Sequence, residues 1–219
     1  MSFAREAWVH ALPPALLAVA AVAFGWWLAG ALLALLAFAL LLFFRIPGVR
    51  SDADESVVLS AADGRVMRVE PAQDPEIDAD ELTRVVTFLS VFDVHVQRAP
   101  ITGRTVSSRY TRGRKVAAFR PDAGDVNEQR LTVLESPSGV RVGVRQIAGL
   151  VARRVVCYLA PGRPARRGEL MGLIRFGSRV DVLVPAGYTV LVSPGNRVRG
   201  GVTPLARPAT LSSREGETT

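Results

Sequence analysis

Apolar and polar positions are distributed very unevenly along the 219 residues, and the first fifth of the chain is almost wholly apolar. From Ala11 to Phe44, 34 consecutive residues carry no charged side chain. One helix of that length would run about 51 Å, whereas the hydrocarbon core of a bilayer is about 30 Å thick. The block therefore predicts a helical membrane anchor. A hairpin that turns at residues 25–30 fits this thickness better than one straight span, which stays open as the alternative.

The residues that flank this block indicate its orientation. Arg5 precedes it and Arg45 and Arg50 follow it, and positive flanks favour the cytoplasmic face. A hairpin would place all three on one side, so we expect the rest of the chain on the cytoplasmic face of the cell membrane. The Trp26–Trp27 pair near the turn suits the opposite membrane interface. A signal peptide fits poorly, because its apolar core would be about half as long.

After Pro47 and Gly48 the pattern changes to short, Val-rich and often alternating segments, which is typical of strands. Gly, Pro and Asp separate these segments at turn positions. The expected strands are 57–59, 65–69, 84–91, 101–110, 130–135, 140–147, 153–159, 173–176, 180–184, 189–192 and 197–202. The pattern predicts a mainly β fold, a compact sandwich or barrel-like domain with few short helices.

These segments divide the chain into three parts. We expect an anchor over residues 1–50, a folded domain over 51–207 and a disordered tail over 208–219, which is rich in Ser, Thr and Glu. Within the folded domain, the acidic run from Asp74 to Glu81 is expected to be a solvated loop.

The composition limits the chemistry that the domain can carry. One Cys excludes a disulfide framework and a zinc or iron–sulfur site built from several Cys. The only His residues are His10 and His95, so a three-His metal site is impossible. The net charge of +7 suits an anionic partner such as a membrane or a nucleic acid.

Three short stretches combine residue types that could carry a reaction. Asp63 stands at a turn, and His95 lies in an apolar, strand-like run two residues after Asp93. Gly177 and Ser178 lie between two further strand-like runs. Each stretch alone has an ordinary structural interpretation, as a turn or as a buried core residue.

Together and in this order, these stretches resemble one protein family. The matching pieces are Ser-Ala-Ala-Asp-Gly at 60–64, Phe-Asp-Val-His-Val-Gln-Arg-Ala-Pro at 92–100, Asn-Glu at 127–128, Gln-Ile-Ala-Gly-Leu-Val-Ala-Arg-Arg-Val-Val-Cys at 146–157 and Gly-Leu-Ile-Arg-Phe-Gly-Ser-Arg-Val-Asp at 172–181. The chain resembles phosphatidylserine decarboxylase proenzymes of the short bacterial and archaeal type, over about residues 50–205.

The resemblance implies a self-processing, pyruvoyl-dependent lyase. Members of this family cut their own chain at a Gly-Ser bond by autocatalytic serinolysis and convert the Ser into the pyruvoyl group. In this chain the matching bond is Gly177–Ser178. The products would be a β chain, 1–177, and an α chain, 178–219, that stay together as a heterodimer. Ser178 would attack the Gly177 carbonyl, His95 would act as the base, and Asp63 would orient His95, as in a Ser-His-Asp triad.

The resemblance also implies the substrate and excludes other cofactors. Phosphatidylserine in the membrane would form a Schiff base with the pyruvoyl group and lose carbon dioxide to give phosphatidylethanolamine. No metal and no pyridoxal phosphate (PLP) is expected. The only Lys, Lys115, lies in a basic, exposed-looking turn, which is a poor setting for a Schiff-base Lys.

Three points of the resemblance stay open. The long bacterial and mitochondrial forms carry a second His where this chain has Arg98. It stays open whether His95 acts only as the base for self-cleavage or also in decarboxylation. Arg154 and Arg179, which lie in the last two matching pieces, are the candidates for contact with the substrate phosphate or carboxylate. Whether the heterodimers pair further is not fixed.

Three alternatives come from other classes of protein. A membrane-anchored β domain without activity, such as an adaptor or a carrier-like module, fits the fold, but a carrier needs a modified Lys in a hairpin. A nucleic-acid binder fits the charge, but aromatic residues do not alternate with the seven Arg that lie between Val151 and Val180. A Cys hydrolase would use Cys157 and His95, but Cys157 lies in an apolar run typical of a buried structural Cys.

Overall fold

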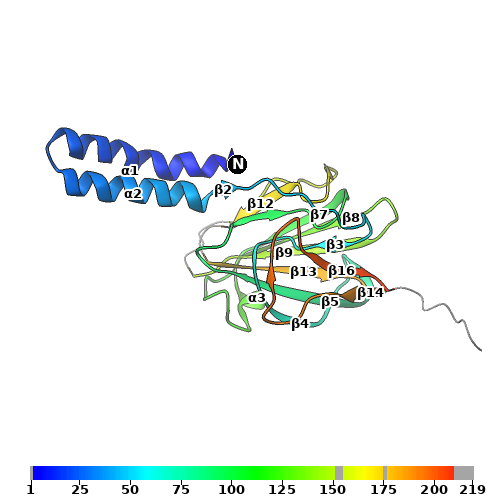
Figure 1. Cartoon of the computed structure of the whole chain (residues 1–219). Coiled ribbons are helices and arrows are strands. Elements are labelled where there is room, and N and C mark those ends of the chain that lie inside the picture. Colours follow the sequence, from blue (N-terminus) through cyan, green and yellow to red (C-terminus); the bar gives the residue numbers. More distant parts are fainter. Residues whose placement is uncertain (1, 151–154, 175–176, 210–219) are drawn as a thin grey trace, which may run out of the picture.

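The computed structural model describes residues 2–150, 155–174 and 177–209, the side chains of Ala79 and Asp80 excepted. The apolar block forms two helices, α1 (Arg5–Ala23) and α2 (Trp27–Phe43), which lie side by side as a hairpin (Figure 1). They are about 28 Å and 26 Å long at 1.5 Å per residue. By length and composition α1 could cross a membrane, and α2 is a shorter apolar helix.

The hairpin turns at Phe24–Trp26, where Gly25 adopts a φ of +80° that other residues rarely reach. Gly30, expected in the turn, lies inside α2 instead. A Cβ at Gly30 would come within 3.2 Å of the Ala18 carbonyl oxygen of α1. The missing side chain therefore lets the two helices pack closely at this point.

The rest of the described chain is mainly β, as predicted, with one short helix α3 (Ala123–Val126). The strands are β1 (Ser2–Phe3), β2 (Arg45–Ile46), β3 (Val58–Leu59), β4 (Gly64–Asp74), β5 (Asp78–Leu89), β6 (Val96–Arg98), β7 (Gly103–Thr111), β8 (Gln129–Glu135), β9 (Arg141–Ile147), β10 (Val155–Cys157), β11 (Pro164–Ala165), β12 (Leu170–Ile174), β13 (Ser178–Val184), β14 (Tyr188–Val190), β15 (Arg197–Val198) and β16 (Pro204–Pro208).

An antiparallel sheet of eight strands, in the order β11-β7-β8-β9-β13-β5-β4-β15, forms the body of the domain. Two three-stranded sheets, β10-β12-β6 and β14-β16-β3, complete it, and β1 pairs with β2 at the base of the hairpin. The large sheet curls around its apolar face (Figure 1). Val85, Val144 and Val182 from neighbouring strands are fully or almost fully buried in that core.

β13 lies in the middle of this sheet, hydrogen-bonded to β9 on one side and to β5 on the other. All seven of its residues are buried. Because side chains alternate along a strand, Val180, Val182 and Val184 enter the core and Arg179 and Asp181 point to the opposite face. Ser178, the first residue of β13, is therefore fixed at one end of a buried strand that has a partner on each side.

The expectation of a solvated acidic loop at 74–81 is wrong. β4 runs to Asp74 and β5 begins at Asp78, so only three residues separate the two strands. Asp74 is buried and pairs with Arg145 at 3.1 Å and with Arg109 at 3.7 Å. Arg residues of neighbouring strands neutralise this carboxylate, and the sequence alone does not reveal such cross-strand partners.

The hairpin packs directly against the β domain. Phe43 and Phe44, at the end of α2, share an apolar cluster with Val94, Val96 and Leu173. Near the start of α1, the Glu6 carboxylate accepts a hydrogen bond of 3.1 Å from the hydroxyl of Tyr158. The base of the hairpin is thus part of the domain core, and only its outer length extends away from the domain.

Candidate active site

The Gly177–Ser178 peptide lies where the chain enters β13. Gly177 has a φ of +57°, a conformation that glycine adopts at little cost. Ser178 is fully buried, and its Oγ has no hydrogen-bond partner among the described residues. Buried hydroxyls without a partner are uncommon. Thr87 and Thr105 share this property among the described residues, and Ser178 differs from them because it directly follows Gly177.

His95 lies directly beside this peptide. Its Nε2 accepts a hydrogen bond of 3.3 Å from the Gly177 N–H, and its Nδ1 lies 2.9 Å from the Asp93 carbonyl oxygen. A ring that accepts at Nε2 and donates at Nδ1 is a neutral imidazole. The structure therefore brings together two features that the sequence indicated separately, His95 and the Gly177–Ser178 bond.

Burial keeps His95 in this neutral form. Desolvation lowers the pKa of His95 from 6.5 to about 4, although the backbone and charge of Asp93 oppose the shift. Phe43 at the end of α2 covers one side of the ring. At neutral pH the imidazole is thus unprotonated, and its Nε2 lone pair faces the Gly177 N–H.

The acceptor that orients the His95 ring is the Asp93 carbonyl, which the sequence did not identify. The Asp93 carboxylate accepts bonds of 2.8 Å and 2.7 Å from the Ser90 N–H and hydroxyl. These bonds close the turn between β5 and β6 and fix the Asp93 backbone. The motif at 92–100 contains Asp93, but the sequence does not reveal whether its backbone carbonyl or its carboxylate accepts the hydrogen bond from His95.

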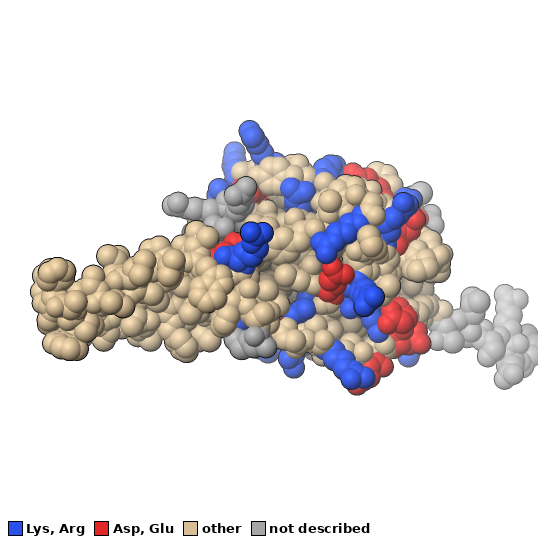
Figure 2. All heavy atoms as spheres, turned by 90° about the horizontal axis from the view of Figure 1, so that it is seen from above, with Lys and Arg blue, Asp and Glu red and all other residues tan. Residues whose placement is uncertain are grey.

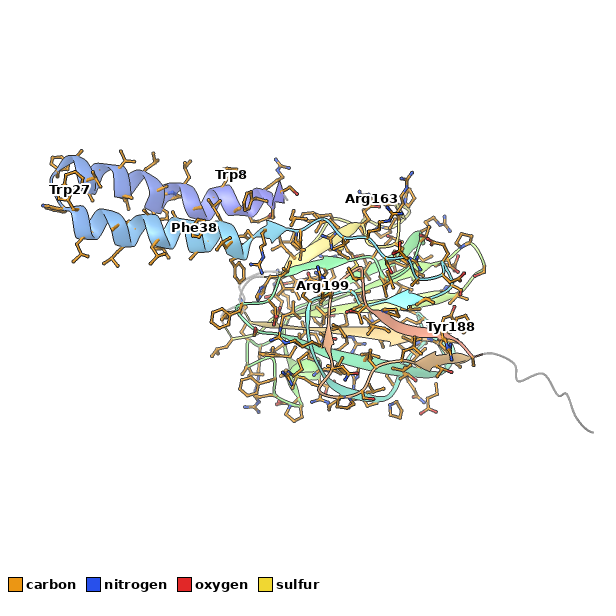
Figure 3. All side chains as sticks on the ribbon, in the orientation of Figure 1. Trp8, Trp27, Phe38, Arg163, Tyr188 and Arg199 are labelled. Carbon is orange, nitrogen blue, oxygen red and sulfur yellow. The ribbon has the colours of Figure 1, made fainter. Side chains whose placement is uncertain are left out.

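Asp63 occupies the turn before β4, as the sequence indicated. Its Oδ1 accepts a bond of 2.8 Å from the Gly200 N–H, next to Arg199, which Figure 3 labels. Burial raises the pKa of Asp63, and the charge of Asp93 adds to the rise. Among the described contacts, no hydrogen bond joins Asp63 to His95. Asp93 is related to both residues, because its charge acts on Asp63 and its carbonyl accepts the hydrogen bond from His95.

A second wall of the site comes from the segment after β9. A Cβ at Gly149 would collide with the carbonyl oxygen of Gly177 and would lie 3.2 Å from the Cβ of Ala118. Gly149 therefore lets the Gly177 carbonyl approach the backbone of this segment. The arrangement explains why this position needs the smallest residue, which the motif at 146–157 did not reveal.

Asn127 holds the two segments of this wall together. Its Nδ2 donates to the carbonyls of Val116 at 2.8 Å and Ala148 at 2.7 Å, and its Oδ1 accepts from the Val116 N–H at 2.9 Å. All its polar atoms are used inside the protein, and the residue is buried. Asn127 belonged to a recognised motif without an assigned role, and the structure gives it a positioning one.

Arg179 does not face the site. Its side chain is 1% exposed, and its Nε and Nη2 donate to the two carboxylate oxygens of Asp181 at 2.6 Å and 2.8 Å. Nη1 is buried without a partner among the described residues. Burial raises the pKa of Asp181, and Arg179 opposes the rise. Arg154, the other candidate for substrate contact, lies outside the described residues.

The remaining reactive side chains are occupied elsewhere. The Cys157 thiol lies 3.6 Å from the Thr132 hydroxyl and 3.5 Å from the Leu159 carbonyl, in β10. Lys115 pairs with Glu128 at 3.6 Å. Within the described ranges, no group of three or more His, Cys, Asp or Glu residues could hold a metal ion.

Comparison with known proteins gives a consistent match. The family model described as phosphatidylserine decarboxylase matches residues 36–206. A phosphatidylserine decarboxylase proenzyme of Symbiobacterium thermophilum is 43% identical over 204 residues, which cover 93% of this chain and 94% of that protein. The proenzymes of Geotalea daltonii and Aromatoleum aromaticum are each 40% identical, over 87% and 93% of this chain and 89% and 94% of theirs.

Proposed function

Because the chain belongs to the phosphatidylserine decarboxylase family, whose members are carboxy-lyases, we propose that it converts phosphatidylserine to phosphatidylethanolamine with a pyruvoyl group made from its own Ser178. The observation that carries this proposal is the contact between the neutral His95 imidazole and the Gly177 N–H, beside the unpaired hydroxyl of Ser178. The family favours an enzyme over a non-enzymatic adaptor.

Self-cleavage begins with Ser178. Its Oγ attacks the Gly177 carbonyl carbon while Nε2 of His95 takes the hydroxyl proton, because a free Ser hydroxyl is too weak a nucleophile. The C–N bond then breaks, the nitrogen of residue 178 gains the proton, and Gly177 is left as an ester on the Ser178 oxygen.

Elimination completes the cleavage. A base removes the α proton of residue 178, the C–O bond breaks, and Gly177 leaves with a free carboxylate. The dehydroalanine that remains tautomerises to an imine, and water hydrolyses it to a pyruvoyl group and ammonia. The pyruvoyl carbonyl supplies the electron sink that decarboxylation requires.

Asp63 is proposed as the third member of this group. Its half-buried carboxylate lies near Asp93, whose charge helps to raise the pKa of Asp63, and the Asp93 carbonyl holds His95. A negative charge on Asp63, added to that of Asp93, would help to stabilise the imidazolium that forms when His95 accepts the proton. In this form of the triad Asp63 acts on His95 through its electrostatic field rather than through a direct hydrogen bond.

The fold supports a processed enzyme whose two chains stay together. After a cut at Gly177–Ser178, the α chain 178–219 would still supply β13, which is hydrogen-bonded between β5 and β9 of the β chain. It would also supply β15 and β16, which pair with β4 and β3 of the β chain. Neither chain would retain the sheet alone, so the product would be an α–β heterodimer.

The substrate and the anchor set the place of action. The hairpin would hold the enzyme in the cell membrane, with the Arg-flanked base and the β domain on the cytoplasmic face. We retain Arg154 as the proposed contact for the substrate head group. Because Arg179 is committed to Asp181 inside the protein, we give it a structural role instead.

Intact-mass analysis of the purified protein tests the proposal. The wild type is expected as two chains, with a pyruvoyl group blocking the N-terminus of the α chain. Ser178→Ala should remain one chain of 23.5 kDa and should not release carbon dioxide from phosphatidylserine. Ser138→Ala, at an exposed turn, is the matched control and should process normally. An uncut wild type with full activity would contradict the pyruvoyl mechanism.

His95→Ala and Asp63→Asn separate the roles around Ser178. His95→Ala should stay uncut because no base remains beside the bond. Asp63→Asn keeps an acceptor for the Gly200 N–H but loses the charge, so its cleavage should slow while its thermal unfolding stays close to that of Ser178→Ala. Normal cleavage of either variant would move that role to another residue.

A further inference from the structure

Large apolar side chains are exposed around the candidate active site. Phe92 is 86% exposed, Leu150 is 67% exposed and Phe119 is 59% exposed. Single exposed apolar residues are ordinary on protein surfaces. These three differ because they come from three separate segments that meet at the same bond. We call them the apolar rim.

Each member of the apolar rim directly follows or precedes a residue of the site around the Gly177–Ser178 bond. Phe92 precedes Asp93, whose carbonyl holds His95. Leu150 follows Gly149, against which the Gly177 carbonyl rests. Phe119 follows Ala118 in the same wall, and its ring packs edge-on against Phe88 at 6.3 Å between centroids.

The hairpin begins at the same place. The Arg45 guanidinium, directly after α2, donates a bond of 3.4 Å to the Phe92 carbonyl and another of 2.7 Å to the Leu42 carbonyl. In Figure 1 the hairpin leaves the domain from the end where α3 lies. In Figure 2 the visible surface of the hairpin is free of charged side chains along its outer length, and charges begin where it meets the domain.

The charges near Phe119 suit a bilayer surface. Arg112, Arg114 and Lys115 are exposed on the segment that leads to Phe119. Basic residues beside exposed aromatic residues are typical of surfaces that bind the interface of anionic membranes. A protein partner would not explain why Phe92 of the apolar rim lies beside the base of the apolar hairpin.

We propose that the apolar rim enters the interfacial layer of the membrane that holds the hairpin, so that the Ser178 site opens directly onto the lipid. This inference rests on the proposed function for its purpose, since a lipid substrate would then reach the site without leaving the bilayer. The occupant of the surface is the lipid bilayer itself.

Spin labels can measure the depth of the apolar rim in the complete protein. Phe92→Cys, Phe119→Cys and Leu150→Cys would each be made in a Cys157→Ser background, because Cys157 is the only native Cys. The labelled chains would be reconstituted in vesicles of phosphatidylcholine and phosphatidylserine. Collision of the label with oxygen and with a water-soluble nickel complex then reports its depth.

Leu191→Cys is the matched control. Leu191 is also an exposed apolar residue, at 43%. It follows β14 and Tyr188, which lie at the end of the domain opposite the hairpin tip with Trp27 (Figure 3). We expect at least a fivefold higher ratio of oxygen to nickel collision at 92, 119 and 150 than at 191.

Other outcomes would overturn the proposal. Nickel accessibility at the rim equal to that at 191 would mean that the rim faces water. Low collision with both reagents would mean a protein partner, and dipolar broadening between identical labels would identify that partner as a second copy of the chain.

The depth measurement is independent of catalysis, so it separates this proposal from the proposed function. If the apolar rim lies in the lipid but the protein has no decarboxylase activity, the membrane-binding surface stands and the proposed function is wrong. As a second readout, Phe92→Ser with Phe119→Ser should lower activity on vesicles about tenfold and activity on a soluble short-chain analogue less than twofold. Equal losses on both substrates would contradict a role in lipid access.

Discussion

The ring of Phe43, the last residue of α2, lies against the imidazole of His95, with the ring centroids 4.1 Å apart and the planes inclined by 35°. The helical hairpin therefore contributes a wall of the candidate active site as well as a candidate membrane anchor. Because Phe43 covers one side of the ring, we expect it to add to the burial that lowers the pKa of His95 to about 4.

Phe43→Ala should change the pH dependence of self-cleavage. The neutral imidazole is the active form, so the wild-type cleavage rate should be constant above about pH 5 and should halve near the pKa of about 4. Opening the wall to water should raise this pKa towards 6.5. At pH 5.5 cleavage by the variant should then fall about tenfold below its plateau, since one pH unit is tenfold in the neutral fraction.

The measurement follows the newly synthesised precursor after a jump to each pH, with the two chains separated on a denaturing gel. Phe43→Leu is the matched control, because it retains an apolar group over His95 and should keep the midpoint near 4. An unchanged midpoint in Phe43→Ala, with cleavage still dependent on His95, would mean that Phe43 does not set this pKa.

Much of the fold follows from local sequence pattern. The apolar block with Gly25 at its centre indicates a hairpin, and alternating Val-rich segments with close turns indicate the strands of a mainly β domain. The pattern failed where the partner of a residue is distant in sequence. Asp74 looks solvated beside its acidic neighbours, but β9 and β7 bring Arg145 and Arg109 to it.

Part of the candidate site could be predicted from the sequence, and part depends on contacts between segments that are distant in sequence. The resemblance to the family predicted Ser178 and His95 as its reactive groups, and His95 is also the only His outside the anchor. Their supports could not be predicted, because a carbonyl such as that of Asp93 exists at every position and has no sequence signature. Phe43 looked like any other apolar residue of the anchor, and only the tertiary structure places it against His95.

Gly149→Ala should block processing. A Cβ at this position would collide with the Gly177 carbonyl oxygen, so either the scissile bond or the segment after β9 must shift. A misplacement of about 1 Å at a reacting group can reduce a rate about 100-fold, and we expect cleavage to slow by at least tenfold. Gly48→Ala is the control, because nothing lies within 4 Å of the position that its Cβ would take. Normal processing of Gly149→Ala would remove this contact from the mechanism.

Asp181→Ala should destabilise the domain strongly. It would leave the Arg179 guanidinium buried in β13 without its carboxylate partner, a change that typically costs about 3–5 kcal/mol. Urea unfolding in mild detergent, in a Ser178→Ala background that keeps the chain uncut, measures the loss. Arg179→Met with Asp181→Leu should recover most of the stability, because it removes both charges together. A loss below about 1 kcal/mol in Asp181→Ala would mean that water or another group reaches Arg179.

Shortening the hairpin should separate its two contributions. Replacing residues 12–39 by a Gly-Ser linker removes the long apolar part but keeps Ala4, Ala7, Phe43 and Phe44, which pack together with Val94 and Leu173 of the domain.

The shortened protein should leave the membrane fraction and still cut itself at Gly177–Ser178, because the wall over His95 is intact. Its activity on vesicles should fall at least tenfold more than its activity on a soluble short-chain analogue, since the anchor confines enzyme and substrate to one surface. The same shortening combined with Phe43→Ala should in addition show the shifted pH midpoint of cleavage. If the shortened protein folds but does not cut itself, the outer length of the hairpin must also contribute to the site, and the division between a structural base and an anchoring tip would be wrong.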